Sequence, residues 1–226
     1  MNNMITLLRK VPLFSNLSNK DILLILRAAK RRKYKKDSII FSENTLGKTL
    51  FIVISGQVKI FVEENKRRKI LSYLEHGEFF GELALLYKNI RSASAEAMTD
   101  CELLILRQND FKQILKNNPN IALELIKVLC ERLRNADKEI ESLSFDSVTS
   151  RIARGLIELS KKYGKPTELG KQLNLIFSKK EIAEYSGTVR EVSTRVLNHL
   201  HKLGYIDFKD RHIVITNEPK LRSLIK

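Results

Sequence analysis

The chain has 226 residues, 43% of them hydrophobic and 30% charged, which is typical of a globular protein with one large or two ordinary domains. Its formal net charge of +15 divides into +8 on residues 1–145 and +7 on residues 146–226, so the shorter C-terminal part is more basic per residue and favours a polyanionic partner. No apolar run reaches the roughly 18 residues of a membrane span and no signal-type segment opens the chain, so we expect a cytoplasmic protein without a membrane partner.

The N-terminal segment combines a helical pattern with a basic run. Residues 5–30 are expected to be helical, with Ser18 as a candidate N-cap and apolar side chains at positions 22, 23, 25 and 26. The run KRRKYKK at 30–36 follows. We interpret it as a solvated edge in preference to a second DNA surface.

The sequence pattern changes between positions 38 and 106. Short runs rich in β-forming residues alternate with turns such as Glu64-Asn65-Lys66-Arg67, and these runs are SIIF, TLFIVISG, QVKIFVEE, KILSYL, SASAEAM and CELLILR. Many short strands over about 70 residues predict a small jelly-roll-like barrel or sandwich.

One segment inside this region, from Gly77 to Ala95, breaks the alternation. Gly81 can open a short helical turn, FGELALL, whose free N–H groups would face an anion. Arg91, nine residues beyond Glu82, is placed to offer a guanidinium fork to the same phosphate, and Glu82 to accept a ribose hydroxyl. On these residues alone, a glycine turn with a surface Glu82–Arg91 pair is the simpler alternative.

A long helix is expected at about residues 120–144. Its apolar positions step alternately by four and three, which is a heptad seam over about three repeats: Ala122, Ile126, Leu129, Leu133, Ala136, Ile140 and Leu143. This seam predicts a two-stranded coiled coil and therefore a homodimer. The alternative is a helix packed on its own barrel.

The C-terminal part begins at a break in the helical pattern, at residues 145–147, which we interpret as a hinge. A helix is expected at 147–163 and a strand at 171–177. Two helices with capping-box spacing follow, Ser178 with Glu181 and Thr188 with Glu191, joined by a turn at Gly187. The runs YIDF and HIVI, joined by a turn at 209–211, predict a β-wing, and a short terminal helix follows residue 219.

The second of these helices is the candidate reading element. Its apolar positions, which are Val189, Val192, Val196, Leu200 and Leu203, fall on one side, and its polar side presents Arg190, Glu191 and Arg195. Two guanidinium forks and a carboxylate suit the donors and acceptors of base edges. Lys179, Lys180 and Thr188 are expected at phosphates. A solvated face with a Glu191–Arg195 pair is the alternative.

Together these motifs carry a resemblance. The segment GELALL…RSASA resembles the phosphate-binding cassette of cyclic-nucleotide-binding domains, with the Glu-to-Arg spacing of regulatory subunits of the cAMP-dependent kinase. With VPLFSNLS, FDSVTSRIA and the helix-turn-helix, the chain resembles the CRP/FNR family of transcription regulators from about residue 11 to 215, closest to its catabolite activator branch. The resemblance implies an α+β protein with a sensor domain at 1–118, a dimerisation helix and hinge at 119–145 and a winged helix-turn-helix domain at 146–226.

The resemblance also implies functions for particular residues. An effector, cAMP or cGMP, would contact Gly81, Glu82, Leu83, Ala84, Arg91 and Ser92. The family's adenine-contacting Thr-Ser pair is replaced by Ala136 and Asp137. Asp137 can only accept hydrogen bonds, which suits guanine better than adenine. The expected partners are double-stranded DNA with a TGTGA-like palindromic half-site, a second copy of the chain, and RNA polymerase.

Other readings remain open. The protein could regulate transcription without an effector and carry a vestigial cassette, or be a cyclic-nucleotide signalling module without DNA. An enzyme is not expected, because no nucleophile–base set appears. Neither metal nor haem is expected, since the histidines are badly spaced and His76 is interpreted as a surface residue. An iron–sulphur cluster is not expected either, since the N-terminal cysteine cluster of that branch of the family is absent. Cys101 and Cys130 are expected to be buried packing thiols.

Overall fold

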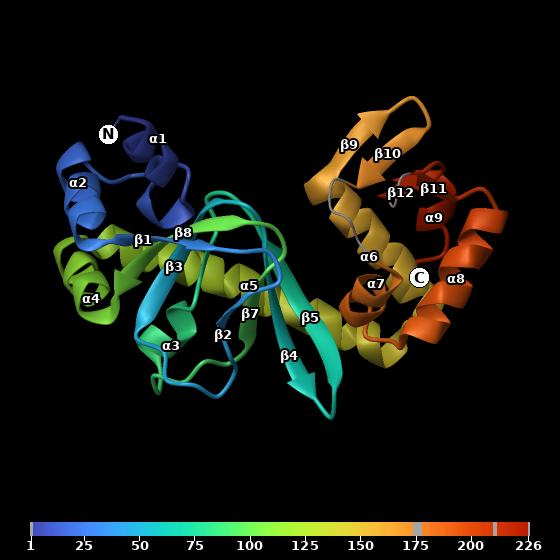
Figure 1. Ribbon diagram of the computed structural model, residues 1–226, viewed down its shortest axis with the longest axis horizontal. Helices are drawn as coiled ribbons and strands as arrows, with labels where there is room; N and C mark the ends of the chain where they lie inside the picture. The colour runs from blue at the N-terminus through green and yellow to red at the C-terminus, as the bar shows by residue number, and fades with distance from the viewer. Residues whose placement is uncertain (1, 174–177, 210–211, 226) are drawn as a thin grey trace. The chain divides into compact units, whose positions relative to one another are not determined.

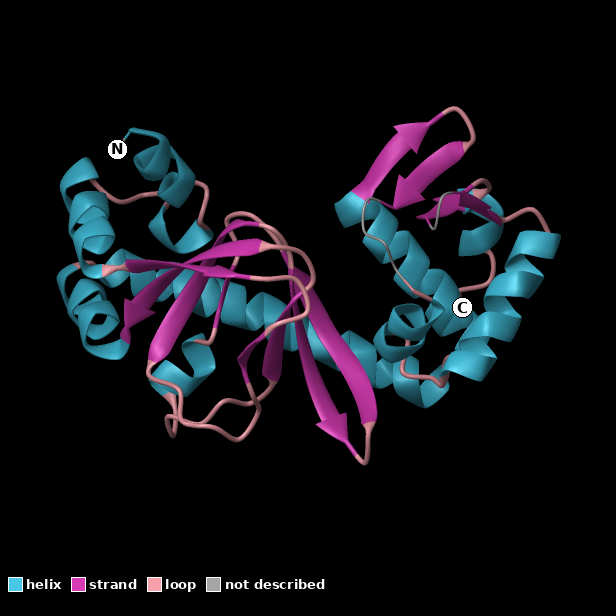
Figure 2. Cartoon of the chain, in the orientation of Figure 1, coloured by secondary structure: helices cyan, strands magenta, loops and turns pink. Residues whose placement is uncertain are grey.

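The computed structural model describes residues 2–173, 178–209 and 212–225 (Figures 1 and 2). The chain divides into two compact units. The first holds residues 1–63 and 71–134, and the second holds residues 64–70 and 135–226. Among the described residues, no helix is long and apolar enough to cross a membrane.

The N-terminal segment is broken into short pieces where a helical stretch over 5–30 was expected. Helix α1 (Asn2–Arg9), the 3-10 helix η1 (Pro12–Phe14) and α2 (Asn19–Ala28) succeed one another. Ser18 caps α2 as predicted, because its side chain accepts a hydrogen bond from the Asp21 N–H. The basic run after α2 is a strand, β1 (Lys30–Tyr34), mostly exposed at the edge of a sheet.

Strands β1 to β8 form two four-stranded sheets, and the strand pairs β1–β8, β3–β8, β3–β6, β2–β7 and β4–β7 are antiparallel. One has the order β1-β8-β3-β6, and the other has the order β2-β7-β4-β5. The bounds are β2 (Ile39–Phe41), β3 (Thr49–Ser55), β4 (Val58–Glu64), β5 (Arg67–Leu74), β6 (Phe79–Phe80), β7 (Ser94–Ala97) and β8 (Cys101–Arg107). This confirms the α+β, jelly-roll-like prediction, and adds β1 and β6 to it.

Local chemistry explains the turns and the core. Asn65 and Lys66 both have positive φ, as the tight turn between two paired strands requires. Aromatic side chains fill the space between the sheets, with the rings of Phe51 and Phe80 stacked at 5.1 Å and Phe41 tilted against both. A second cluster joins the N-terminal helices to the first sheet around Phe14, Ile52 and Phe111.

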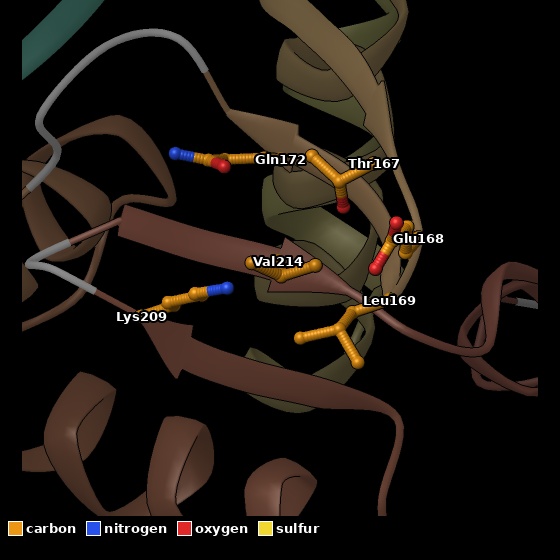
Figure 3. A pocket seen from close by; sticks show the side chains of 6 residues that line it. All are labelled: Thr167, Glu168, Leu169, Gln172, Lys209 and Val214. Carbon is orange, nitrogen blue, oxygen red and sulfur yellow. The ribbon is translucent and has the colours of Figure 1, made fainter.

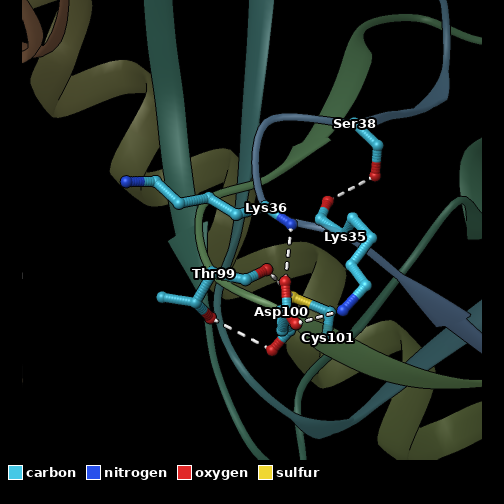
Figure 4. A network of polar contacts seen from close by, with 6 residues as sticks. All are labelled: Lys35, Lys36, Ser38, Thr99, Asp100 and Cys101. Atoms are coloured by element: carbon cyan, nitrogen blue, oxygen red, sulfur yellow. Dashed lines mark hydrogen bonds and ion pairs between the residues drawn. The ribbon is translucent and has the colours of Figure 1, made fainter.

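The end of β1 is fastened to the turn between β7 and β8 (Figure 4). Asp100 accepts hydrogen bonds from Lys35 Nζ at 2.9 Å and from the Lys36 N–H at 2.9 Å, which lower the pKa of this carboxyl. Cys101 beside it is buried as predicted, and burial raises the pKa of its thiol. The same prediction was wrong for Cys130, which is exposed on the long helix.

Helix α4 (Gln108–Asn117) leads into the long helix α5 (Pro119–Phe145), which confirms the expected long helix. Residues up to 134 of α5 belong to the first unit and the later ones to the second. The seam side chains are largely uncovered, with Ile126 55%, Leu133 64% and Ile140 64% exposed. Leu129 differs, since it is partly buried against the core of the first unit.

The second unit is a winged helix-turn-helix. Helix α6 (Val148–Tyr163) starts at Ser147, which caps it, and a sheet of order β11-β12-β10-β9 follows. Its other elements are β9 (Gly164–Thr167), β10 (Gly170–Leu173), α7 (Lys179–Tyr185), α8 (Arg190–Lys202), β11 (Ile206–Lys209), β12 (His212–Ile215) and α9 (Glu218–Arg222). The wing strands and the terminal helix match the prediction, and β9 was missed. Residues 174–177 of the expected strand, and 210–211 of the wing turn, lie outside the described residues.

Candidate functional site

The helix-turn-helix forms around one confirmed cap and one tight turn. Ser178 Oγ accepts from the Glu181 N–H at 3.1 Å, and Glu181 Oε2 accepts from the Ser178 N–H at 3.1 Å, which is the predicted capping box of α7. Gly187 has φ +62°, a conformation that side chains disfavour, so glycine fits the turn into α8.

The second predicted capping box was wrong. The N-cap of α8 is Val189 and not Thr188, and no side chain caps this helix. Arg190 is therefore the first helical residue, and Glu191 in the first turn has no capping role that competes with a base contact. Its charge is still favourable there, because the N-terminus of a helix is partially positive.

The packed face of α8 also differs in part from the expectation. Ser193, Leu197 and Leu200 are buried, whereas Val189 and Leu203 are 44% and 47% exposed. The sequence pattern shows which positions of α8 are apolar, but not how far along the helix they are buried. The two ends of the apolar face do not reach the core. The polar face is as predicted, because Arg190, Glu191 and Arg195 are all exposed.

The residues predicted to contact phosphates differ in how much the protein itself occupies their side chains. Lys179 Nζ donates to Asn198 Oδ1 at 2.9 Å and lies 5.2 Å from the centre of the Phe208 ring, so it connects α7, α8 and the wing. Lys180 is exposed, with Glu184 Oε1 3.6 Å away. Thr188 is partly buried. Lys180 is thus the more available cation for a phosphate.

A residue that the sequence reading missed fixes the turn before the reading helix. Arg151 on α6 donates from Nη1 to the Asp146 carbonyl at 3.0 Å, from Nε to the Ser186 carbonyl at 3.1 Å and from Nη2 to the Gly187 carbonyl at 3.3 Å. Three backbone acceptors from the hinge and the turn therefore share one guanidinium. No sequence pattern announces such backbone acceptors.

The hinge carboxylate is held as well. Asp146 Oδ2 accepts from Ser142 Oγ at 2.8 Å and from Arg154 Nη2 at 2.8 Å. These contacts, with that of Ser142 the largest, lower the pKa of Asp146.

The wing sheet carries a shallow cavity of about 300 Å³ (Figure 3). It is lined by Thr167, Glu168, Leu169, Gln172, Lys209 and Val214. Its polar side chains are thus one carboxylate, one amine, one hydroxyl and one amide. Across the described parts of the chain, no group of three His, Cys, Asp or Glu side chains is placed to hold a metal ion.

In the first unit, the cassette is built around α3 (Glu82–Leu86). Arg91 is only 3% exposed. It donates from Nη1 to the Gly81 carbonyl at 2.9 Å, and from Nη2 to the Thr49 carbonyl at 2.9 Å and to Thr49 Oγ1 at 2.8 Å. Its guanidinium also lies 4.1 Å from the centre of the Phe41 ring. A Cβ at Gly81 or at Gly47 would overlap this guanidinium, so the backbone can enclose Arg91 only where it lacks side chains.

Glu82, which is 1% exposed, does not pair with Arg91 at the surface. Its Oε1 accepts from Arg132 Nη1 on α5 at 2.7 Å, and Arg132 Nη2 donates to the Phe79 carbonyl at 2.7 Å. Burial lowers the pKa of Arg91 to about 10, with Glu82 acting in the opposite direction, so Arg91 remains charged near neutral pH. The simpler alternative of an exposed Glu–Arg pair was wrong.

Two buried polar atoms of the cassette, Glu82 Oε2 and Arg91 Nε, have no hydrogen-bond partner among the described residues. Buried polar groups without a hydrogen bond are rare and costly. One is an acceptor and the other a charged donor, so they would complement a ligand with a hydroxyl and an anionic oxygen. A sugar phosphate has this combination.

The remaining predicted effector residues are dispersed. Ala84 in α3 is buried, whereas Leu83 is 47% exposed and Ser92 is exposed. Asp137 is exposed on α5, in the part of the helix that belongs to the second unit, so its base contact stays a prediction. Sequence reading missed Thr49 and Arg132.

Comparison with known proteins agrees with this geometry. Residues 31–118 match the model of the cyclic nucleotide-binding domain, and residues 150–224 match that of the Crp-like helix-turn-helix domain. The cyclic AMP receptor protein of Thermus thermophilus is 36% identical over 86% of this chain and 88% of that protein. The cAMP-activated global transcriptional regulator Vfr of Pseudomonas aeruginosa is 32% identical over 84% of this chain and 91% of its own.

A solved structure shares the same architecture. The c-di-GMP responsive global regulator CLP of Xanthomonas campestris has a TM-score of 0.78 at 30% identity and covers 88% of this chain and 99% of its own. The chain thus has a buried Glu–Arg cassette in one unit and an exposed Arg-Glu-Arg face on a helix-turn-helix in the other. The family model that matches each of these units is the one that its geometry suggests. The chain belongs to the CRP/FNR family of DNA-binding transcription regulators.

Proposed function

We propose that the chain is a homodimeric regulator that reads a palindromic, TGTGA-like DNA site and responds to a cyclic nucleotide held by its cassette. The observation that carries this proposal is the exposed face of α8, where Arg190, Glu191 and Arg195 project beyond a packed helix-turn-helix. The protein would act in the cytoplasm, where it meets its DNA and RNA polymerase.

The chemistry of this face suits guanine and cytosine. Arg190 and Arg195 can each donate two hydrogen bonds to O6 and N7 of a guanine in the major groove. Glu191 can accept from a cytosine amino group, and it is free to do so because it caps no helix. Phosphate contacts from Lys180 would position the helix without carrying sequence information.

The cassette would hold the effector through its two free polar atoms. The anionic oxygen of the cyclic phosphate would accept a hydrogen bond from Arg91 Nε, and a ribose hydroxyl would donate one to Glu82 Oε2. Arg132 connects the same carboxylate to α5, so a ligand at Glu82 acts on a residue of the long helix. Asp137 would select guanine if its side chain reaches the base.

The dimer is supported by the seam of α5. Large apolar side chains that are more than half exposed in one chain would be covered when two copies of α5 pair. Two-fold symmetry then places the two reading helices on half-sites about one helical turn of DNA apart.

Selection of bound sites from a random DNA pool tests the proposal. The wild type should return a two-fold-symmetric motif with paired guanines, and the Arg190→Ala variant should lose preference at one position of each half-site, at a cost of about 1–3 kcal/mol. Lys202→Ala, which removes a charge at the far end of α8, serves as the control and should leave the motif unchanged. Recovery of no symmetric motif by the wild type would refute the assignment.

A further inference from the structure

A basic hollow lies on the first unit, at the end of the sheet that begins with β1. Its volume is about 230 Å³. It is lined by Lys30, Arg31, Arg32, Thr49, Ile105 and Arg107, so four lining residues are cationic and none is a carboxylate. Within the described residues, neither Lys30 nor Arg107 has a hydrogen bond or an ion pair through its side chain.

Strand register explains why these side chains converge. Lys30 lies opposite Ile105 in the β1–β8 pair, and Thr49 lies opposite Arg107 in the β3–β8 pair. Directly opposed residues, and residues two apart on one strand, share a face of the sheet. Lys30, Arg32 and Arg107 therefore project from the same face, together with Thr49.

Protection of a sheet edge does not account for this arrangement. Lysine on an edge strand discourages pairing with other chains, and that would explain Lys30 on β1. Arg107, however, comes from β8, which is an inner strand. It is also the N-cap residue of α4, where it makes no capping hydrogen bond and where a cation is electrostatically unfavourable.

The protein balances only part of this positive charge. Arg31 has a counter-ion in Glu102, at 3.4 Å, and Arg32 lies 5.1 Å from the centre of the Tyr34 ring. In the described parts of the chain, Lys30 and Arg107 have neither a counter-ion nor an aromatic ring beside them. Like charges brought together on one face raise the local positive potential, and a bound anion would relieve it.

Thr49 places the hollow beside the cassette. Its carbonyl and its Oγ1 both accept from Arg91 Nη2, at 2.9 and 2.8 Å, and the same residue lines the hollow. We propose that the basic hollow, adjoining the Arg91 site through Thr49, binds a phosphate group. That phosphate is either the second phosphate of a nucleotide already held by the cassette or part of a free diphosphate-type anion.

Inorganic pyrophosphate is the probe that tests the hollow directly. Calorimetric titration of the full chain at low salt should give saturable binding, and the double variant Lys30→Gln/Arg107→Gln should weaken it at least tenfold. The matched control is Lys33→Gln/Lys36→Gln, which removes the same charge from exposed positions outside the hollow and should bind like the wild type. Absence of saturable binding in the wild type, or equal weakening in both double variants, would overturn the proposal.

Two further titrations distinguish the source of the phosphate. If it belongs to the effector, the hollow variant should weaken a cyclic dinucleotide tenfold and leave cAMP unchanged, and pyrophosphate should compete with the dinucleotide. If it is a separate anion, pyrophosphate should bind equally well to protein saturated with cAMP. The pyrophosphate result does not depend on the effector assignment, so a cassette that binds no nucleotide would leave the test of the hollow intact.

Discussion

Arg132 on the long helix α5 donates a 2.7 Å hydrogen bond to Oε1 of Glu82, a carboxylate that is 1% exposed in the cassette. The other carboxylate oxygen, Oε2, has no hydrogen-bond partner within the part of the chain that the structure describes. The carboxylate that would receive a sugar hydroxyl is thus the one that anchors this part of α5.

Removal of either partner should destabilise the first unit, and removal of both should cost less than the two losses together. Arg132→Gln leaves a buried charge without its counter-ion, whereas in a Glu82→Gln background that charge is absent. We expect a coupling of about 1–2 kcal/mol in the free energy of unfolding from a double-mutant cycle in urea. Arg134→Gln, at an exposed position two residues further along α5, is the control. Strict additivity of the two substitutions would contradict the pairing.

The hinge should be sensitive to acid through Asp146. Hydrogen bonds from Ser142 and Arg154 place its folded pKa below the unfolded value. As the pH falls through this interval the unfolded chain binds more protons, so the stabilisation is present above the unfolded pKa and is lost as the pH falls through the folded one. Asp146→Asn should lower the melting temperature at pH 7. Between about pH 5 and pH 3, the usual range of Asp titration, the variant should lose less stability than the wild type.

The comparison of melting temperatures needs a matched carboxylate. Asp137→Asn removes an exposed acid on α5 and should leave the profile unchanged. Asp titration ends at about pH 5. If both variants follow the wild-type melting profile below this pH, Asp146 does not contribute to the acid sensitivity of the hinge.

Salt dependence should separate phosphate contacts from base contacts. Lys180→Ala should weaken binding to specific and unrelated DNA alike and reduce the slope of log K against log salt by about 1. Arg195→Ala should cost about 1–3 kcal/mol, mainly on the specific site. Lys179 is a poorer phosphate probe, because its amine is engaged by Asn198. A fluorescence-anisotropy titration at several salt concentrations measures both effects, and identical behaviour of the two variants would contradict the division.

The seam should control assembly. Glutamate at Leu133 and Ile140, which are each 64% exposed, would bring four carboxylates together between paired helices. The double variant should sediment as a monomer and lose specific DNA binding. Lys138→Glu and Arg134→Glu, at exposed positions off the seam, provide the control, and a double seam variant that still sediments as a dimer would refute the interface.

Much of the fold was predictable from local sequence patterns. The strands from SIIF to CELLILR are short runs of β-forming residues between turns, and the helix at 119–145 shows apolar positions that step alternately by four and three. Strand β1 was not predictable in the same way, because KRRKY has no apolar alternation and is fixed by its register against β8. The two-residue strand β6 is too short to show any period.

The sites were predictable where local spacing carries the geometry. Gly81, Glu82 and Arg91 lie in one short segment, and the capping box at Ser178 needs only two residues three apart. Thr49 and Arg132 could not be found this way, because their hydrogen-bond partners are far away in the sequence. Thr49, at the start of β3, lies 42 residues from Arg91, and Arg132, on α5, lies 50 residues from Glu82. The predicted cap of α8 was wrong although the spacing of Thr188 and Glu191 fits a capping box, because the N-cap is Val189, one residue after Thr188.

The guanidinium of Arg151 links two segments of the second unit. It joins the carbonyl that ends the hinge to the two carbonyls of the turn in front of α8. Asp146 therefore cannot move relative to the turn unless at least one of these three hydrogen bonds breaks. The start of the reading helix is thus tied to the hinge by a single side chain of α6.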